Sequence, residues 1–154
     1  MLTDVETKSI LSEIEVAVDP RAACVEALKI VQRAQGYVPD EAMKDLAPLL
    51  GMTADELEGV ATFYSFIFRE PVGRHIILVC DSVTCWIMGY EEILTALKEH
   101  IGIGFGETTK DGRFTLLPVS CIGACDHAPA IMVDGRLYGD LDRERIGGLL
   151  AGYE

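Results

Sequence analysis

The sequence predicts an α+β protein in two parts, a helical bundle over residues 1–70 and a small α/β domain over residues 71–154. Two observations predict this division. Before residue 70 the apolar residues recur at helical spacing, whereas residues 75–80 form a continuous β-rich apolar run, as buried strands do. Between the two patterns, Glu70-Pro71-Val72-Gly73 interrupts the helical period. A chain of 154 residues is long enough to bury a proper core.

The first two helices are indicated by apolar stripes and by a start signal. Residues 1–18 are acidic and carry three apolar residues at helical spacing. Asp19 is a good N-cap for a second helix, with Pro20 at its first position, and Gly36 is a natural stop. Cys24 lies beside the apolar stripe of this second helix without a partner cysteine nearby. We interpret it as a small buried hydrophobe.

Two further helices complete the helical part. The third begins at Pro39-Asp40, and Pro48 should bend or shorten it because proline removes a backbone donor. The fourth begins with a capping box, in which Thr53 bonds forward and Glu56 reaches back. Its inward-facing residues are expected to be Leu57, Val60, Ala61 and Tyr64. Residues 63–68 hold more aromatic side chains than one helix face can hide, so we expect some of them to pack on the next domain.

The second part alternates strands and helices. Residues 75–80 form the first strand, and residues 81–88 are polar and mixed, as a loop is. The remaining elements are a helix at 90–101, strands at 113–120, 130–133 and 136–138, and a helix at 141–150. Asp134-Gly135 is a strong signal for a two-residue hairpin between the last two strands. The order is therefore β, α, β, β, β, α.

Four of the five cysteines form two local pairs that follow strand ends. Cys80 closes the first strand and Cys85 follows it, while Cys121 and Cys125 follow the next strand. The ends of neighbouring strands in a sheet bring their following loops together, so the two pairs are expected to meet. This placement, with the order of the elements, predicts a small thioredoxin-like α/β domain. Pro129 stands just ahead of a strand beside the second pair and is a candidate cis proline, as found in many thioredoxin-like folds.

Ligation by cysteine alone suits a [2Fe–2S] cluster, although the same four sulfurs could hold zinc. We favour iron–sulfur on the spacing and keep zinc open. A dithiol oxidoreductase would use C-x-x-C, and neither pair has it. His127 follows Cys125 by two residues, which is half of a Rieske pattern, but no second C-x-H exists. We interpret His127 as a loop residue beside the site.

A cluster of this kind carries single electrons without an acid or base, and we expect no catalytic residue in this chain. The segment Gly102-Ile-Gly-Phe-Gly106 is not G-x-G-x-x-G and follows a helix instead of a strand. Bound NADH or flavin within this chain is therefore unsupported, and another polypeptide has to supply the electrons.

Composition excludes other classes of partner. The formal net charge of −12 is spread over both halves, so nucleic-acid phosphates and anionic lipid surfaces would repel the chain. Hydrophobic residues make up 49% of it, yet no apolar run approaches the roughly 18 residues of a membrane span. We expect a partner protein to cover part of that surplus. Nothing marks a signal peptide, and a reducing cytosol weakens a disulfide interpretation of the cysteines.

With these residues in view, the chain resembles the thioredoxin-like [2Fe–2S] ferredoxin family, and within it the E subunits of bacterial NADH–quinone oxidoreductases (respiratory complex I). The resemblance runs from Asp19 onward and leaves the first eighteen residues uncovered. The segments that carry it include Asp19-Pro-Arg-Ala-Ala23, Glu26-Ala-Leu-Lys-Ile-Val31, Gly36-Tyr-Val-Pro-Asp40, Glu58-Gly-Val-Ala-Thr-Phe-Tyr-Ser65, Pro71-Val-Gly-Arg-His75, Cys80-Asp-Ser-Val-Thr-Cys85, Gly106-Glu-Thr-Thr109, Asp111-Gly-Arg-Phe-Thr-Leu116 and Cys121-Ile-Gly-Ala-Cys125. Their joint occurrence is far more specific than four cysteines alone.

The resemblance implies a [2Fe–2S] cluster on Cys80, Cys85, Cys121 and Cys125, in a domain on which an N-terminal helical bundle packs. It implies a permanent partner, the flavin- and NADH-binding F subunit of the same complex, whose FMN exchanges single electrons with this cluster. Other subunits of the peripheral arm are implied as neighbours. The location would be cytoplasmic, in an arm attached to the cytoplasmic face of the inner membrane, without direct membrane insertion.

Two alternatives stay open at this stage. Related subunits serve NAD-linked hydrogenases and formate dehydrogenases, and the cysteine pattern does not separate them. A thioredoxin-like interaction module stabilised by zinc, with no redox role, belongs to a different class. Trp86 departs from the smaller or polar residue expected after the second cysteine, and would shield the cluster or rest on the partner.

Overall fold

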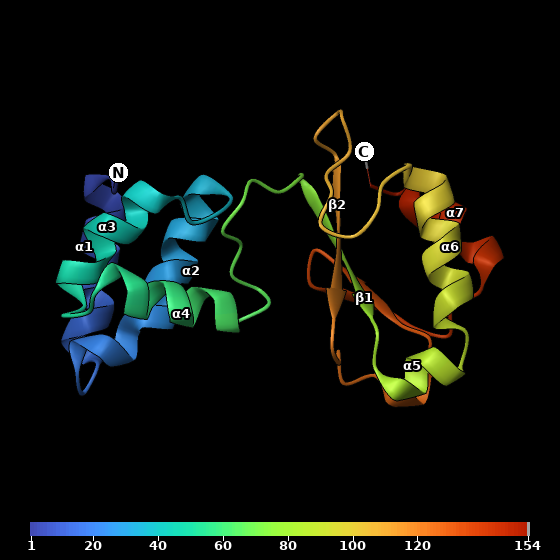
Figure 1. The fold of residues 1–154 in the computed structure, drawn as a ribbon, viewed down its shortest axis with the longest axis horizontal. Coiled ribbons are helices and arrows are strands. Elements are labelled where there is room, and N and C mark those ends of the chain that lie inside the picture. The colour runs from blue at the N-terminus through green and yellow to red at the C-terminus, as the bar shows by residue number, and fades with distance from the viewer. Residues whose placement is uncertain (154) are drawn as a thin grey trace. The chain divides into compact units, whose positions relative to one another are not determined.

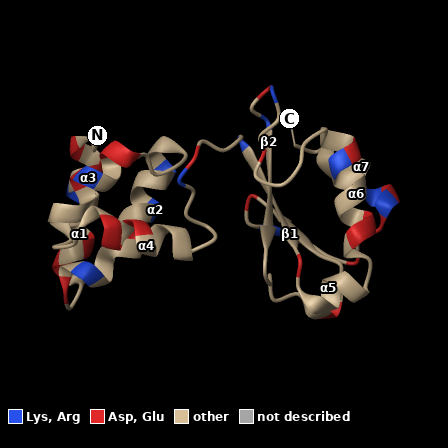
Figure 2. Ribbon diagram, viewed as in Figure 1, with Lys and Arg blue, Asp and Glu red and all other residues tan. Residues whose placement is uncertain are grey.

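The structure is a computed structural model that describes residues 1–153, and it confirms the α+β fold class. The chain divides into two compact units, Met1–Pro71 and a second that begins at Val72 (Figure 1). The first unit is entirely helical within the described residues, and the second contains a four-stranded sheet. Acidic residues are spread over both units (Figure 2).

The helical unit is built from capped, amphipathic helices. Its elements are α1 (Asp4–Val16), the 3₁₀ turn η1 (Pro20–Ala23), α2 (Cys24–Gln35), α3 (Asp40–Leu49) and α4 (Ala54–Phe63). The expected capping box at α4 is present, with Thr53 accepting from the backbone of Glu56. The Asp19 side chain caps η1, a 3₁₀ turn that leads into α2, by accepting from the Arg21 N–H. These local bonds satisfy backbone donors that a helix start leaves free.

The core of this unit is aliphatic. Its fully buried large side chains are Ile10, Leu28, Val31, Leu46, Leu50 and Leu57. Cys24 packs against this core as an apolar residue, but it is half-buried and not fully buried as the sequence predicted. Pro48 lies in the last turn of α3, which ends one residue later, so the expected shortening is confirmed.

The prediction that Tyr64 faces inward is wrong. The helix α4 ends at Phe63, and Tyr64 is extended, with φ −91° and ψ 110°. An extended residue leaves the helical face, and Tyr64 is 45% exposed while Phe63 is 79% exposed. The Tyr64 ring meets the Phe63 ring edge to face. Ile67 takes the buried place instead.

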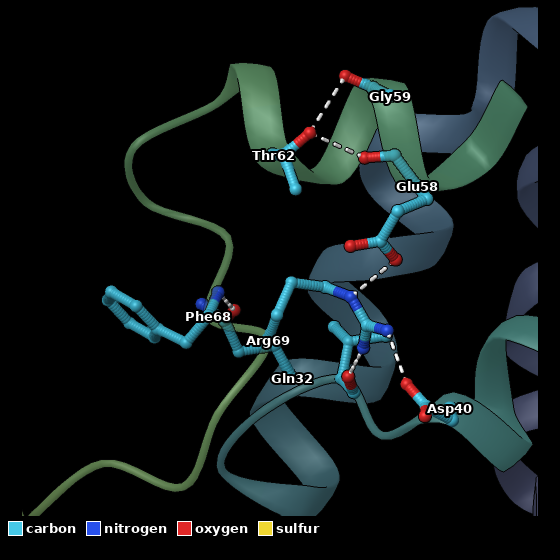
Figure 3. A network of polar contacts seen from close by, with 8 residues as sticks. Gln32, Asp40, Glu58, Gly59, Thr62, Phe68 and Arg69 are labelled. Carbon is cyan, nitrogen blue, oxygen red and sulfur yellow. Dashed lines mark hydrogen bonds and ion pairs between the residues drawn. The ribbon is translucent and has the colours of Figure 1, made fainter. Parts of the chain in front are cut away.

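A network of polar side chains holds the segment after α4 against the helices (Figure 3). The Gln32 amide donates to the Phe66 carbonyl at 2.8 Å and accepts from the Phe68 N–H at 2.6 Å, as a neighbouring strand would. The Arg69 guanidinium bonds the carboxylates of Glu58 and Asp40 and the backbone carbonyl of Val38. An irregular segment is fixed in this way because its backbone groups have specific partners.

We expect Arg69→Ala to lower the free energy of unfolding of the helical unit by about 2 kcal/mol. The Arg69 side chain is 17% exposed and its loss leaves a backbone carbonyl and two carboxylates without their donor. Urea denaturation followed by circular dichroism measures the change. The matched control is Arg33→Ala, since Arg33 is 70% exposed and 3.9 Å from Glu26, and should cost less than about 0.5 kcal/mol. Equal losses in the two variants would contradict this role of Arg69.

The second unit is a mixed sheet with helices. Its elements are β1 (His75–Cys80), α5 (Val83–Ile87), α6 (Tyr90–Ile101), β2 (Phe114–Val119), the 3₁₀ turn η2 (Cys125–His127), β3 (Ile131–Val133), β4 (Arg136–Tyr138) and α7 (Arg143–Leu150). The strand order is β2-β1-β3-β4, with β1 parallel to β2 and both other pairings antiparallel. The helices α6 and α7 lie side by side and pack on the sheet (Figure 1). Their shared core is mostly aliphatic, with Leu97, Leu116 and Ile146, and also contains Phe114.

The chain enters this sheet through a close backbone contact. The Gly73 N–H donates to the Thr115 hydroxyl at 2.6 Å, and Thr115 is buried and pairs with Ile76 of β1. A Cβ at Gly73 would lie 2.9 Å from the carbonyl carbon of Phe114, which is closer than real side chains approach. Only glycine fits there without displacing the backbone of β2.

Two local predictions for this unit are confirmed and one is wrong. Asp134 and Gly135 have φ of 50° and 81°, which is the left-handed geometry of the predicted hairpin, and the Ala128–Pro129 bond is cis. The expected loop at residues 81–88 contains the short helix α5 instead. This helix has only five residues and no side-chain cap, so its local sequence carries little signal that would predict it. No helix among the described residues is long and apolar enough to cross a bilayer.

Candidate metal centre

Parallel pairing of β1 and β2 brings the two cysteine segments to one edge of the sheet. Cys80, the last residue of β1, is in register with Val119, the last residue of β2. Cys121 follows two residues later. Strands that run the same way end at the same edge, so the loops that follow them start side by side. The expected meeting of the two strand ends is confirmed.

Cys80 and Cys85 lie together in a small buried cluster. They are 4% and 2% exposed, and they pack with Ala124, Ala128 and Ala130. The helix α5 places Cys85 against Cys80, the last residue of β1. Trp86, the next residue, is 60% exposed. On the other side of β1, the Cys80 N–H donates to the Ala130 carbonyl at 3.2 Å. Small alanine side chains therefore line the space beside the two sulfurs.

The environment of Cys85 favours the neutral thiol. Burial raises its pKa to about 11, and a hydrogen bond with the Cys80 thiol contributes to the rise. A bond to the backbone of Ala130 acts in the opposite direction. Cys125 is close enough to add to the rise. A metal bound at Cys85 would have to displace this proton, because the thiolate is the form of cysteine that binds metals.

Cys121 and Cys125 are exposed. Cys125 begins the turn η2, and Ala124, the residue before it, is buried against Cys80 and Cys85. Gly123 has φ 84°, and a Cβ there would meet no protein atom within 4 Å. Glycine is therefore favoured at this position by the left-handed backbone conformation and not by close packing against other protein atoms.

The donor set fits a [2Fe–2S] cluster. All four thiols are free, and they form one buried pair, which packs against alanines, and one exposed pair. Within residues 1–153, no three or more Cys, His, Asp or Glu side chains are gathered tightly enough to enclose a single metal ion. A [2Fe–2S] cluster does not require all four thiolates to surround one ion, because the thiolates are divided between two irons.

His127 lies beside the site, bonded to carboxylates. Its Nδ1 is 2.7 Å from Oδ2 of Asp140, and its Nε2 is 3.5 Å from Asp126. The hydrogen bond to Asp140, with the charges of both carboxylates, raises the pKa of His127. His75 is the first residue of β1, at the opposite end of that strand from Cys80.

Sequence reasoning missed the alanine wall and the contact between His127 and Asp140. Ala128 and Ala130 carry no chemical signal of their own, and thirteen residues separate His127 from Asp140. Only the pairing of β1 with β3, and of β3 with β4, brings these segments to the cysteines.

A four-stranded sheet with two free cysteine pairs at the ends of adjacent parallel strands defines a small cysteine-ligated metalloprotein domain. The chain belongs to the thioredoxin-like [2Fe-2S] ferredoxin family, whose model matches residues 7–154. This membership confirms the family resemblance and the expected [2Fe–2S] cofactor. The match begins twelve residues before Asp19, so it also takes in most of the N-terminal helix.

The chain is similar to the E subunit of the NADH-quinone oxidoreductase of Pseudomonas aeruginosa, with 52% identity over 153 residues. The corresponding E subunit of Escherichia coli K12 is 51% identical over the same length. Each match covers 99% of this chain and 92% of the relative. Among solved structures, a chain of an NAD+-reducing [NiFe]-hydrogenase is similar at 28% identity and a TM-score of 0.69. That match covers 82% of this chain but only 22% of the hydrogenase chain.

In the cluster-free protein we expect iodoacetamide to modify Cys121 and Cys125 before Cys80 and Cys85. Cys121 and Cys125 are exposed, whereas Cys80 and Cys85 are buried. In addition, the Cys85 thiol, with a pKa of about 11, is ionised at pH 8 on the order of one part in a thousand. Peptide mass spectrometry of a timed reaction gives the order, and urea-unfolded protein, in which all five should react alike, is the control. Reaction of Cys85 as fast as Cys125 would show that the buried pair is not formed.

Proposed function

We propose that this chain is the electron-transfer subunit of an NADH–quinone oxidoreductase and holds a [2Fe–2S] cluster on Cys80, Cys85, Cys121 and Cys125. The observation that carries the proposal is the pairing of β1 with β2, which places one cysteine pair after each of two adjacent strand ends. The identity of about half with the two E subunits, over nearly the whole chain, supports the parent complex. We further propose that residues 1–70 and 71–154 are separate domains, a helical bundle and a cluster domain.

The cluster supplies reversible one-electron chemistry when bound. The protein's part is to hold it and to limit the access of water. Cys80 and Cys85 provide a dry pair, since both are almost completely buried. Cys121 and Cys125 provide a pair at the surface. The acidic chain disfavours added negative charge, which lowers a reduction potential.

A partner polypeptide has to deliver the electrons, and we propose that it is the flavin- and NADH-binding F subunit of the same complex. The segment 102–106 connects α6 to the loop before β2, so it is not the strand-to-helix turn that binds a dinucleotide. Several apolar side chains in α5, or next to it in the chain, are more than half exposed and lie close to Cys85 in the sequence. They are Val83, Trp86, Ile87 and Met88. A patch of that kind favours a protein neighbour. Trp86 would then rest on the partner.

On this proposal the protein works on the cytoplasmic side, in the peripheral arm of a membrane-attached complex and among its other subunits. A second candidate is the equivalent domain of an NAD-linked hydrogenase, which the likeness to the [NiFe]-hydrogenase chain favours. The identity there is 28%, against 52% for the relative from Pseudomonas aeruginosa, so we prefer the quinone-linked complex.

Purified protein is expected to be brown, with two irons per chain and an EPR signal that appears on reduction. Serine at Cys80, Cys85, Cys121 or Cys125 should abolish or distort this signal, because an alkoxide is a poorer ligand for iron than a thiolate. Cys24→Ser is the matched control and should keep the full cluster, since Cys24 packs in the helical unit. Colourless protein with one bound zinc would refute the electron-transfer role and favour the zinc-stabilised module.

The partner is tested by affinity purification of the tagged chain from its native host. We expect a flavoprotein that oxidises NADH to co-purify, together with quinone-reducing activity. Substitution of Trp86 by Glu places a charge in the exposed patch and should reduce the flavoprotein yield while the cluster content stays unchanged. If a hydrogenase co-purifies and quinone-reducing activity does not, the result would favour the second candidate, the domain of an NAD-linked hydrogenase.

A further inference from the structure

A three-residue turn after β4 is bonded to the segment that follows Cys125. The N–H of Asp140 donates to the His127 carbonyl at 2.7 Å, and the N–H of Leu141 donates to the Pro129 carbonyl at 3.3 Å. The side chains repeat the contact, with Nδ1 of His127 2.7 Å from Oδ2 of Asp140. Both the backbone and the side chain of His127, two residues after Cys125, are therefore attached to this turn.

The backbone of the turn is shaped for this contact. A Cβ at Gly139 would lie 2.5 Å from Cβ of His127 and 2.6 Å from its carbonyl oxygen, so no side chain fits between them. Asp140 follows with φ 51°, the left-handed region that few residues other than glycine adopt. Such a conformation persists where the surrounding structure holds it in place.

The Cys125 segment needs such an attachment because burial does not fix it. Cys121 and Cys125 are both exposed, whereas Cys80 and Cys85 are held by β1, by α5 and by the alanine wall. A side chain at the surface is located by its backbone. The backbone after Cys125 is tied to the turn at residues 139–141.

We propose that the turn Gly139–Leu141 is a positioning element for the cluster, which holds the Cys125 end of the exposed cysteine loop in place for cluster binding. Gly139 permits the close approach, and Asp140 holds His127 by its backbone and its side chain. The inference rests on the proposed function, because it requires Cys125 to be a ligand. Partners of ligand segments commonly affect metal affinity by about 10- to 100-fold when removed.

The test is Gly139→Ala in the full chain, with Gly148→Ala as the matched control. Gly148 lies in α7, has no positive φ, and a Cβ there would meet nothing within 4 Å. Both proteins are loaded with the cluster, and the decay of its visible absorption is followed in excess chelator. We expect Gly139→Ala to lose the cluster about tenfold faster than wild type, and Gly148→Ala to match wild type. Equal decay in all three proteins would overturn the positioning role.

The side-chain bond is tested separately, by His127→Leu and His127→Asn. Leucine removes the donor to Asp140, while the asparagine amide keeps a donor near the place of Nδ1. We expect faster cluster loss and a changed reduced-state EPR line shape for leucine, and recovery of wild-type behaviour for asparagine. Leucine with wild-type values in both readouts would overturn the role of the side chain.

Two controls separate the possible failures. Hydrogen exchange of the Asp140 amide in cluster-free protein should be faster in Gly139→Ala, because its bond to His127 is broken, and unchanged exchange would overturn the inference. Thermal unfolding of both cluster-free alanine variants tests whether the fold is kept. If wild type itself binds no [2Fe–2S] cluster, the proposed function fails and the positioning role with it. If wild type is loaded and both alanine variants behave alike, the positioning role alone fails.

Discussion

The proposed cluster site depends on one constraint, the parallel register of β1 and β2. Six consecutive pairs, from His75 with Phe114 to Cys80 with Val119, set where both strands end. On the other flank of β1, β3 brings Ala130 to the amide of Cys80. Backbone hydrogen bonds therefore bring three segments that are far apart in the chain to one edge of the sheet. If the β1–β2 register slipped by one residue, the cysteine pair of one strand would move along that strand relative to the other pair. The side chains of the slipped strand would also turn to the other face of the sheet.

The two cysteine pairs are supported by different means. Cys80 and Cys85 belong to a strand and a short helix and are enclosed by alanines, so the same packing that folds the domain also positions them. Cys121 and Cys125 lie on an exposed loop whose attachment comes from hydrogen bonds between His127 and the turn after β4. One half of the site is part of the core, and the other half is held against it from outside.

The features that could be read from the sequence are those with local causes. The capping box at Thr53, the hairpin at Asp134-Gly135 and the strand ending at Cys80 each follow from a few neighbouring residues. The cysteine spacing identified the candidate ligands without any structure. The missed features depend on contacts between distant segments. The helix α5 has only one turn and no side-chain cap, so packing of Cys85 decides it more than propensity. The contact of Gly139 with His127 exists only because β3 and β4 fold back beside the site.

The close contact at Gly73 determines where a shortened version of the second unit should begin. Gly73 lies outside the strands, yet its N–H is one of two hydrogen-bond partners of the buried Thr115 hydroxyl, the other being Thr108. A shortened chain that began at His75 would keep every strand and every cysteine of the site but would withdraw that donor from the interior of the sheet. A minimal electron carrier made from this protein should therefore start upstream of Gly73, at a boundary that strand assignments alone would place too late.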